Sequence, residues 1–194
     1  MTQFAQLWIP IVLSAVLVFA ASSVIHMVLK WHNSEYRKLS NEGAVGAAIR
    51  AGSASPGQYF IPHCPDMKQM QTPEMQRKFV EGPIAFIVLR PPGPPKMGGA
   101  LVQWFVYSLV VGFVGACVAV NTMPETHGAL VAAGAVGHNA AIVTGAIAFF
   151  AYAGGAIPGA IWMGKPWSSA MKEILDGIIY AVITGATFAW LWPH

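Results

Sequence analysis

The 194-residue chain contains only 10% charged residues against 55% hydrophobic ones, and its mean hydropathy is +0.54. Soluble domains average about 25% charged residues, so this composition excludes an ordinary soluble protein and indicates a membrane protein. The net charge of +3 would also suit a nucleic-acid-binding protein. However, the basic residues gather between two apolar segments, where they are explained as topology signals. We therefore expect contact with a lipid bilayer and none with nucleic acid.

The first predicted element is an apolar stretch over residues 7–29, which is long enough to cross the ~30 Å hydrocarbon core of a bilayer. No basic residue precedes it, whereas Lys30, Arg37 and Lys38 follow it. A secretory signal carries its basic residues before the apolar core, so this pattern indicates an uncleaved anchor with its N-terminus outside. Residues 1–30 are thus predicted to form the first transmembrane helix.

Residues 31–100 form the one long polar segment, and we interpret them as an extramembrane insert of mixed α+β structure. Thr72 as N-cap and Pro73 at the first helical position predict a helix over 73–81. A short apolar run over 84–89, bounded by Gly-Pro and Arg-Pro, predicts a strand. The proline-rich stretch 90–99 that follows is predicted to be a stiff connector.

Residues 101–194 are predicted to hold three further spans, at about 101–120, 129–152 and 174–192. The loops after the first and third spans contain every Lys and Arg of the chain, which by the positive-inside rule places the insert in the cytoplasm and both termini outside. The expected fold is therefore an integral membrane protein, mainly α, with a four-transmembrane-helix bundle and a small α+β insert between helices 1 and 2. A short polytopic chain of this kind favours the bacterial inner membrane.

Small residues recur at four-residue spacing in the last two spans. Such stripes let helix backbones approach closely in lipid, where association depends on packing and not on the hydrophobic effect. They predict tight packing within the bundle, with docking onto a partner helix or a second copy as the alternatives. The stripes consist of Ala133, Gly137, Ala141 and Gly145 in the third span and of Gly177, Ala181 and Gly185 in the fourth.

Three polar residues within the spans are candidates for a functional site. His138 and Asn139 lie about ten residues into the third predicted span, which suggests a depth near the middle of the bilayer, where ionisable groups are rare. They are interpreted either as a substrate, quinone or proton site or as polar groups that hold helices together. Asp176 lies in the first turns of the fourth span, where it complements the helix dipole, can pair with Lys172 or can control ion entry.

The histidines and the soft ligands of the chain bear on two possible cofactors, haem and copper. His26 and His138 are predicted to differ in height by ~16 Å, which argues against a haem held by both within one subunit. His63, Cys64, Met67 and Met70 offer soft ligands that suit Cu(I), although their spacing also fits the core of a small domain. The sequence requires no cofactor.

The functional expectation follows from what the chain lacks as well as from what it contains. No nucleophilic triad, phosphate-binding loop or pair of catalytic carboxylates is recognisable, which favours a non-catalytic protein. The leading hypothesis is an accessory, assembly or structural subunit of a larger membrane complex or homo-oligomer. The alternatives are a small transporter or channel that uses His138 and Asn139, and a copper or redox protein that uses His63 and Cys64.

Overall fold

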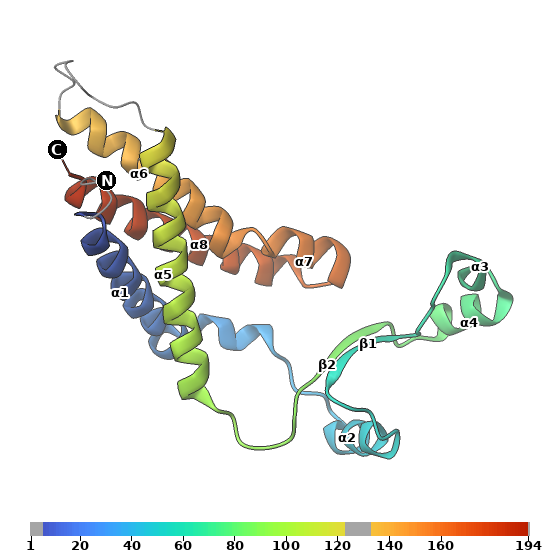
Figure 1. Cartoon of the computed structure of the whole chain (residues 1–194). Helices are drawn as coiled ribbons and strands as arrows, with labels where there is room; N and C mark the ends of the chain where they lie inside the picture. Colours follow the sequence, from blue (N-terminus) through green and yellow to red (C-terminus); the bar gives the residue numbers. More distant parts are fainter. Residues whose placement is uncertain (1–5, 123–132, 194) are drawn as a thin grey trace. The chain divides into compact units, whose positions relative to one another are not determined.

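The computed structural model describes residues 6–122 and 133–193. The chain divides into two compact units, one made of Met1–Tyr36 with Lys96–His194 and the other of Arg37–Pro95. Within the described residues the first unit is helical and contains four helical segments that are long and apolar enough to cross a membrane (Figure 1). The second unit contains a two-stranded sheet and short helices.

The first long helix changes its winding before it ends. Helix α1 (Trp8–Ser23) continues into a π-helical turn, η2 (Val24–Leu29), and the chain then reverses at Lys30, which adopts a left-handed conformation with φ 53°. A short 3-10 helix, η3 (Trp31–Glu35), follows. The apolar part matches the predicted span 7–29, whereas the reversal has no counterpart in the prediction, because hydropathy does not report backbone winding.

The remaining helices of this unit are α5 (Met97–Thr122), α6 (Ala133–Ala153), α7 (Ala156–Met163) and α8 (Trp167–Leu191). Helix α8 begins well before the predicted start at 174, because its first turns carry Lys172 and Glu173, which a hydropathy search excludes. The predicted third span begins at 129, and residues 129–132 lie outside the described part of the chain. The described part of that span continues through the turn at Gly154 and Gly155 into α7.

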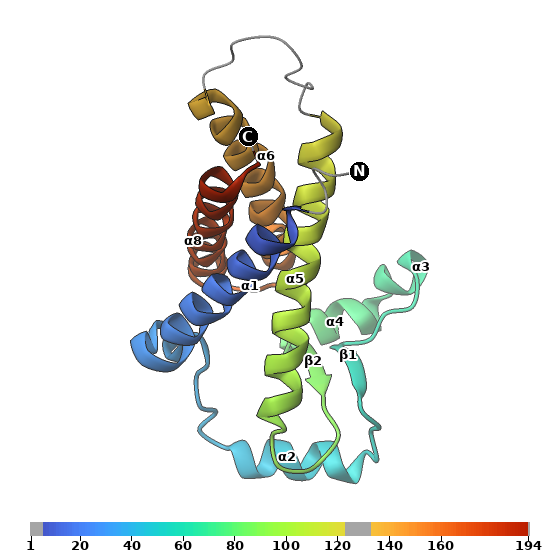
Figure 2. The same ribbon diagram turned by 60° about the vertical axis from the view of Figure 1, so that its left-hand side comes forward.

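Helices α6 and α8 run antiparallel and lie side by side (Figures 1 and 2). A Cβ atom placed on Gly185 would lie 2.7 Å from the carbonyl oxygen of Ala141, and one on Gly137 would lie 2.9 Å from that of Ala189. Real Cβ atoms do not approach so closely, so only glycine permits this separation of the backbones. Gly137, Ala141 and Gly185 belong to the two predicted stripes. The side chain of Ala133, a further member, lies outside the described part of the chain.

The other helices complete the first unit around this pair. Helix α1 packs against α5 and α8, and α5 packs against α6. Much of the outer surface remains apolar, with exposed side chains such as Val102, Phe150 and Val182. An apolar exterior of this extent fits contact with a lipid bilayer.

The second unit is built on a small antiparallel sheet. Strand β1 (Gly57–Ile61) pairs with β2 (Ala85–Leu89), with Gly57 opposite Leu89 and Ile61 opposite Ala85. Helices α2 (Glu42–Ala51), α3 (Met67–Met70) and α4 (Pro73–Glu81) make up the rest of its regular structure. Met75 is the one side chain of this unit that is buried. One face of the sheet is half-buried at Tyr59 and Ile87, and the other face is exposed. A lone pair of strands is marginally stable in water, so this unit contains very little core of its own.

Helix α4 matches the predicted bounds because its end signals act as expected. The Thr72 hydroxyl accepts a hydrogen bond from the backbone N–H of Met75, Pro73 occupies the first turn, and Gly82 with φ 65° follows the last residue. Lys78 donates a hydrogen bond of 2.7 Å to Glu74, one turn earlier. This hydrogen bond and the positive charge of Lys78 hold the pKa of the Glu74 carboxyl below its usual value of 4.5.

The close approach of α6 and α8 yields a testable prediction. We expect Gly185→Ala to lower the free energy of unfolding by about 1–3 kcal/mol, because the added methyl group forces the two backbones apart. Unfolding of the detergent-solubilised protein by a denaturing detergent measures the effect. Gly115→Ala is the matched control, since its Cβ would meet Thr144 at an ordinary 3.5 Å and alanine favours the helix. Equal stability of the two variants would contradict this account of the packing.

Candidate functional site

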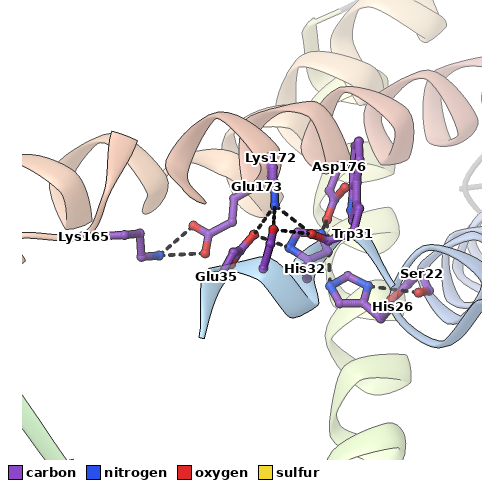
Figure 3. A network of polar contacts seen from close by, with 10 residues as sticks. Ser22, His26, Trp31, His32, Glu35, Lys165, Lys172, Glu173 and Asp176 are labelled. Atoms are coloured by element: carbon purple, nitrogen blue, oxygen red, sulfur yellow. Dashed lines mark hydrogen bonds and ion pairs between the residues drawn. The ribbon is translucent and has the colours of Figure 1, made fainter. Parts of the chain in front are cut away.

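A cluster of five polar side chains joins the end of the first helix to the start of the last within the first unit (Figure 3). It consists of His26 from η2, His32 and Glu35 from η3, and Lys172 and Asp176 from α8. Their contacts span up to 144 positions of sequence. The cluster is therefore a product of the tertiary fold.

The local backbone explains how the two histidines meet. The π-helical turn places His26 near the end of the first helix, and the left-handed Lys30 turns the chain back so that η3 begins at Trp31. As a result, the imidazole rings of His26 and His32 stack with centroids 4.6 Å apart and planes 1° from parallel. A π-turn is rare and is often found at functional sites.

Each imidazole has a polar partner on both ring nitrogens. Nε2 of His32 lies 2.9 Å from Oδ2 of Asp176, and its Nδ1 lies 2.6 Å from Oε1 of Glu35. Nδ1 of His26 lies 3.0 Å from the backbone oxygen of Ser22. Nε2 of His26 lies 3.8 Å from the same Oδ2 of Asp176, so one carboxylate oxygen faces both rings.

Burial makes these contacts energetically important. The side chains of Asp176, Glu35 and His32 are 7%, 11% and 13% exposed, whereas that of His26 is 49% exposed. Oδ1 of Asp176 is buried without a hydrogen-bond partner among the described residues. A buried carboxylate with only one oxygen satisfied lowers the stability of the fold. Asp176 is therefore a candidate for a functional role.

Lys172 attaches η3 to α8. Its Nζ donates hydrogen bonds of 2.7 Å to the backbone oxygen of Trp31 and to Oγ of Ser34, and it lies 3.9 Å from Glu35. The sequence suggested that Lys172 could pair with Asp176, but its hydrogen bonds go to η3, and the contacts of Asp176 are with the two histidines. Lys165 instead pairs with Glu173 at 2.7 Å.

The structure separates the three residues that the sequence proposed as one intramembrane site. His138 and Asn139 are exposed on α6, whereas Asp176 is buried in α8. Gly137 contacts Ala189, two residues before the end of α8. His138, which follows Gly137, therefore lies near the last residues of α8, and its depth in a bilayer stays a prediction. Asp176 is thirteen residues before Ala189, which corresponds to about 20 Å along the axis.

His138 instead lines a shallow apolar groove of ≈ 440 Å³ on the exposed side of the α6–α8 pair. Four of its other residues, Ala141, Gly145, Ala181 and Gly185, are members of the predicted stripes. The groove is completed by Ile142, Ala146, Val182 and Ala186. The small side chains thus shape an external surface in addition to the contact between the two helices.

The soft-ligand candidates lie in the second unit around α3. His63, Met67 and Met70 are exposed. The Cys64 thiol donates to the backbone oxygen of Asp66 at 3.2 Å. In the described residues, the one set of three His, Cys, Asp or Glu ligand atoms that lie together is that of His26, His32 and Asp176. The soft-ligand candidates His63, Cys64, Met67 and Met70 are not part of that set.

Sequence reasoning missed His32 and Glu35. His32 follows His26 by six residues, a spacing that does not place two side chains on one face of an α-helix. The available signal was the polar run Trp31-His32-Asn33-Ser34-Glu35 directly after the first span, with two groups that can bind protons or cations. Its relation to Asp176 could not be seen without the fold.

The cluster can act chemically in two ways besides attaching η3. Imidazole groups in general can bind and release a proton near neutral pH, and imidazole and carboxylate groups are ligands of transition-metal ions. His26, His32 and Asp176 are the residues that could hold such an ion.

Comparisons of the chain with protein-family models, curated proteins and solved structures found no match.

The attachment of η3 to α8 yields a second prediction. We expect Lys172→Met to speed amide hydrogen exchange in residues 31–36 by about 10- to 100-fold. Each hydrogen bond to a charged group contributes about 1.5–3 kcal/mol to the free energy of local opening. The variant lacks the hydrogen bonds of Lys172, so η3 opens more often and its amides exchange faster. Hydrogen exchange followed by mass spectrometry measures this.

Lys165→Met is the matched control, because Lys165 forms a more exposed ion pair with Glu173 and such pairs contribute about 1 kcal/mol or less. Unchanged exchange in Lys172→Met would mean that Lys172 does not hold η3.

Proposed function

We propose that this protein is an integral membrane protein with four transmembrane helices that acts as a non-catalytic accessory or assembly subunit of a larger membrane complex. In this proposal residues 31–100 lie in the cytoplasm of a bacterial cell and both termini lie outside, as the distribution of Lys and Arg favours. The partner is a membrane protein whose own helix packs against α6 and α8.

The observation that carries the proposal is the exposed groove between α6 and α8. Its floor is built from small residues, including Gly145 and Gly185, and its volume is ≈ 440 Å³. In lipid, helices associate where small residues allow close backbone approach. A groove of this kind on the outer face of two apolar helices is the shape that a further helix fits.

His138 adds a polar group to this surface. It is exposed on α6 and lines the groove. Lipid chains offer no hydrogen-bond partner, so a polar side chain on a lipid-facing surface is favoured when a neighbouring helix provides one. His138 would thus help to select the partner and its register.

The second unit supports the same proposal independently. Its two strands pair only with each other, and apolar side chains such as Val80, Ile84 and Val88 are exposed. Exposed apolar side chains and unpaired strand edges are typical of surfaces that a partner covers. A partner subunit would supply the core that this unit lacks.

The two alternative functions suggested by the sequence, transport and copper binding, are supported by fewer contacts between residues of the structure. A transport path through His138 and Asp176 would have to link two residues about 20 Å apart along the helix axis. At the candidate copper site, His63 is exposed and the Cys64 thiol donates to the backbone oxygen of Asp66.

The groove provides the test. Ala146 and Ala186 line it and are exposed, so Ala146→Leu and Ala186→Leu fill it without entering the α6–α8 contact. We expect the double variant to lose most of a partner subunit that remains bound to the wild-type protein after mild detergent extraction. Native mass spectrometry from the native membrane reads the mass and stoichiometry of the complex.

Val110→Leu is the matched control, because Val110 is an exposed residue of α5 outside the groove. The wild type must show a second membrane subunit in fixed stoichiometry that Val110→Leu retains. A lone chain in native membranes, or a complex equally intact in the double variant, would refute the docking role of the groove. A homodimer that the double variant dissolves would assign the groove to a second copy of this chain.

A further inference from the structure

Three ligand atoms from three separate segments converge at the end of the first helix. One ring nitrogen of His26, one of His32 and a carboxylate oxygen of Asp176 all lie within 4.8 Å of one another. The residues come from η2, η3 and α8 (Figure 3). We infer that they bind a divalent first-row transition-metal ion.

The distances suit such an ion after small adjustments. Zinc binds imidazole nitrogen and carboxylate oxygen at about 2.0–2.2 Å, so neighbouring ligand atoms of a tetrahedral site lie about 3.3 Å apart. Here Oδ2 of Asp176 lies 2.9 Å from Nε2 of His32 and 3.8 Å from Nε2 of His26. These two distances bracket the tetrahedral value. The two imidazole planes are parallel, so the half-exposed ring of His26 must also tilt before both nitrogens face one ion.

The outer contacts prepare both rings to bind through Nε2. The backbone oxygen of Ser22 can only accept, so Nδ1 of His26 carries the proton of that 3.0 Å hydrogen bond. Nδ1 of His32 can donate in the same way to Glu35 at 2.6 Å, and in that tautomer Nε2 beside Asp176 carries no proton and is free to bind an ion. Metal-binding histidines nearly always donate their second N–H to a carbonyl or carboxylate. Both histidines of this cluster have such a partner.

Asp176 provides an independent indication of a missing partner. Its side chain is 7% exposed, yet its Oδ1 has no hydrogen-bond partner among the described residues. Buried polar atoms of native proteins are nearly always satisfied, and the exceptions need an explanation. An ion that is bound at Oδ2 and also approaches Oδ1 would satisfy both oxygens with no further hydrogen-bond donor.

The charges around the site favour a cation. Asp176 and Glu35 carry two negative charges, and Lys172 carries the positive charge that lies 3.9 Å from Glu35. With neutral imidazoles this group is net negative in a buried environment, where electrostatic attraction is strong. Lys165 and Glu173 neutralise each other at 2.7 Å and leave that balance unchanged.

The ligand set narrows the class of ion. Two imidazoles and one carboxylate, with no thiolate, suit zinc, iron(II) and related divalent ions better than Cu(I). Three protein ligands leave one coordination position for water or a small ligand, which is the arrangement of catalytic and not of structural zinc sites. His26 also lines an apolar groove of ≈ 300 Å³ with Met27 and Trp104, so the ion would be accessible from that side.

The inference stands apart from the subunit proposal, because the cluster shares no residue with the α6–α8 groove. The test uses the full chain in detergent, purified through an affinity tag that contains no histidine. Bound metals are counted by mass spectrometry of the elements. The metal-free protein is then titrated with Co²⁺, whose optical absorption reports the ligand geometry, and with Zn²⁺ in competition. We expect one ion per chain.

Four variants locate the ion. We expect His26→Ala and Asp176→Asn to weaken Co²⁺ binding by more than the about 10- to 100-fold that loss of an outer-shell partner costs, and Glu35→Gln to weaken it by about that amount. His138→Ala is the matched control, since it removes an exposed histidine outside the cluster and should leave binding unchanged. His26 is half exposed, so its replacement leaves the buried His32–Asp176 contact in place and preserves the fold.

Far-ultraviolet circular dichroism confirms that each variant remains helical. A wild-type protein that binds less than one ion per chain at saturating Co²⁺ would overturn the inference. Equal affinities of wild type, His26→Ala and Asp176→Asn would overturn it as well, because the ion would then lie elsewhere.

Discussion

The arrangement of the first unit depends on one buried carboxylate, that of Asp176, which needs polar partners in an apolar environment. Asp176 of α8 is almost fully buried, and an unpaired charge in a buried position costs several kcal/mol. Its available partners are imidazoles from the first helix and from the turn that follows. The reversal at Lys30, the π-turn before it and the hydrogen bonds of Lys172 all bring those imidazoles to Asp176 and keep them there. The polar cluster thus ties the start of α8 to the segment that precedes the insert.

A second constraint operates at the other end of the helix pair. Glycine at positions 137 and 185 allows the backbones of α6 and α8 to approach until a Cβ atom would collide with a carbonyl oxygen. Because the same stripes continue onto the outer surface, they also form the floor of a groove. One pattern of small residues therefore has two structural consequences, an internal contact and a surface that can receive a further helix.

Most helices of the fold could be predicted from the sequence, because their signals act between residues that are close in sequence. Helix α4 has the predicted bounds because Thr72, Pro73 and Gly82 act within a few residues of each end. The stripe residues lie at the α6–α8 contact because a four-residue spacing places side chains on one helix face. The start of α8 was misplaced because Lys172 and Glu173 are polar, although both lie in a helix. The contact of Gly137, next to His138, with the last residues of α8 could not be predicted, because it depends on how α6 is aligned with α8.

Composition and local spacing alone determined that this chain has four long apolar segments, a polar insert with a capped helix, and small-residue faces on the last two spans. Those properties follow from interactions between near neighbours in sequence. Only the tertiary structure decided which polar groups meet. His32 and Asp176 are 144 positions apart, and His26 and His32 do not share a helical face. Their contact depends on a backbone reversal at a lysine and on the packing of α1 against α8, and neither leaves a periodic pattern in the sequence.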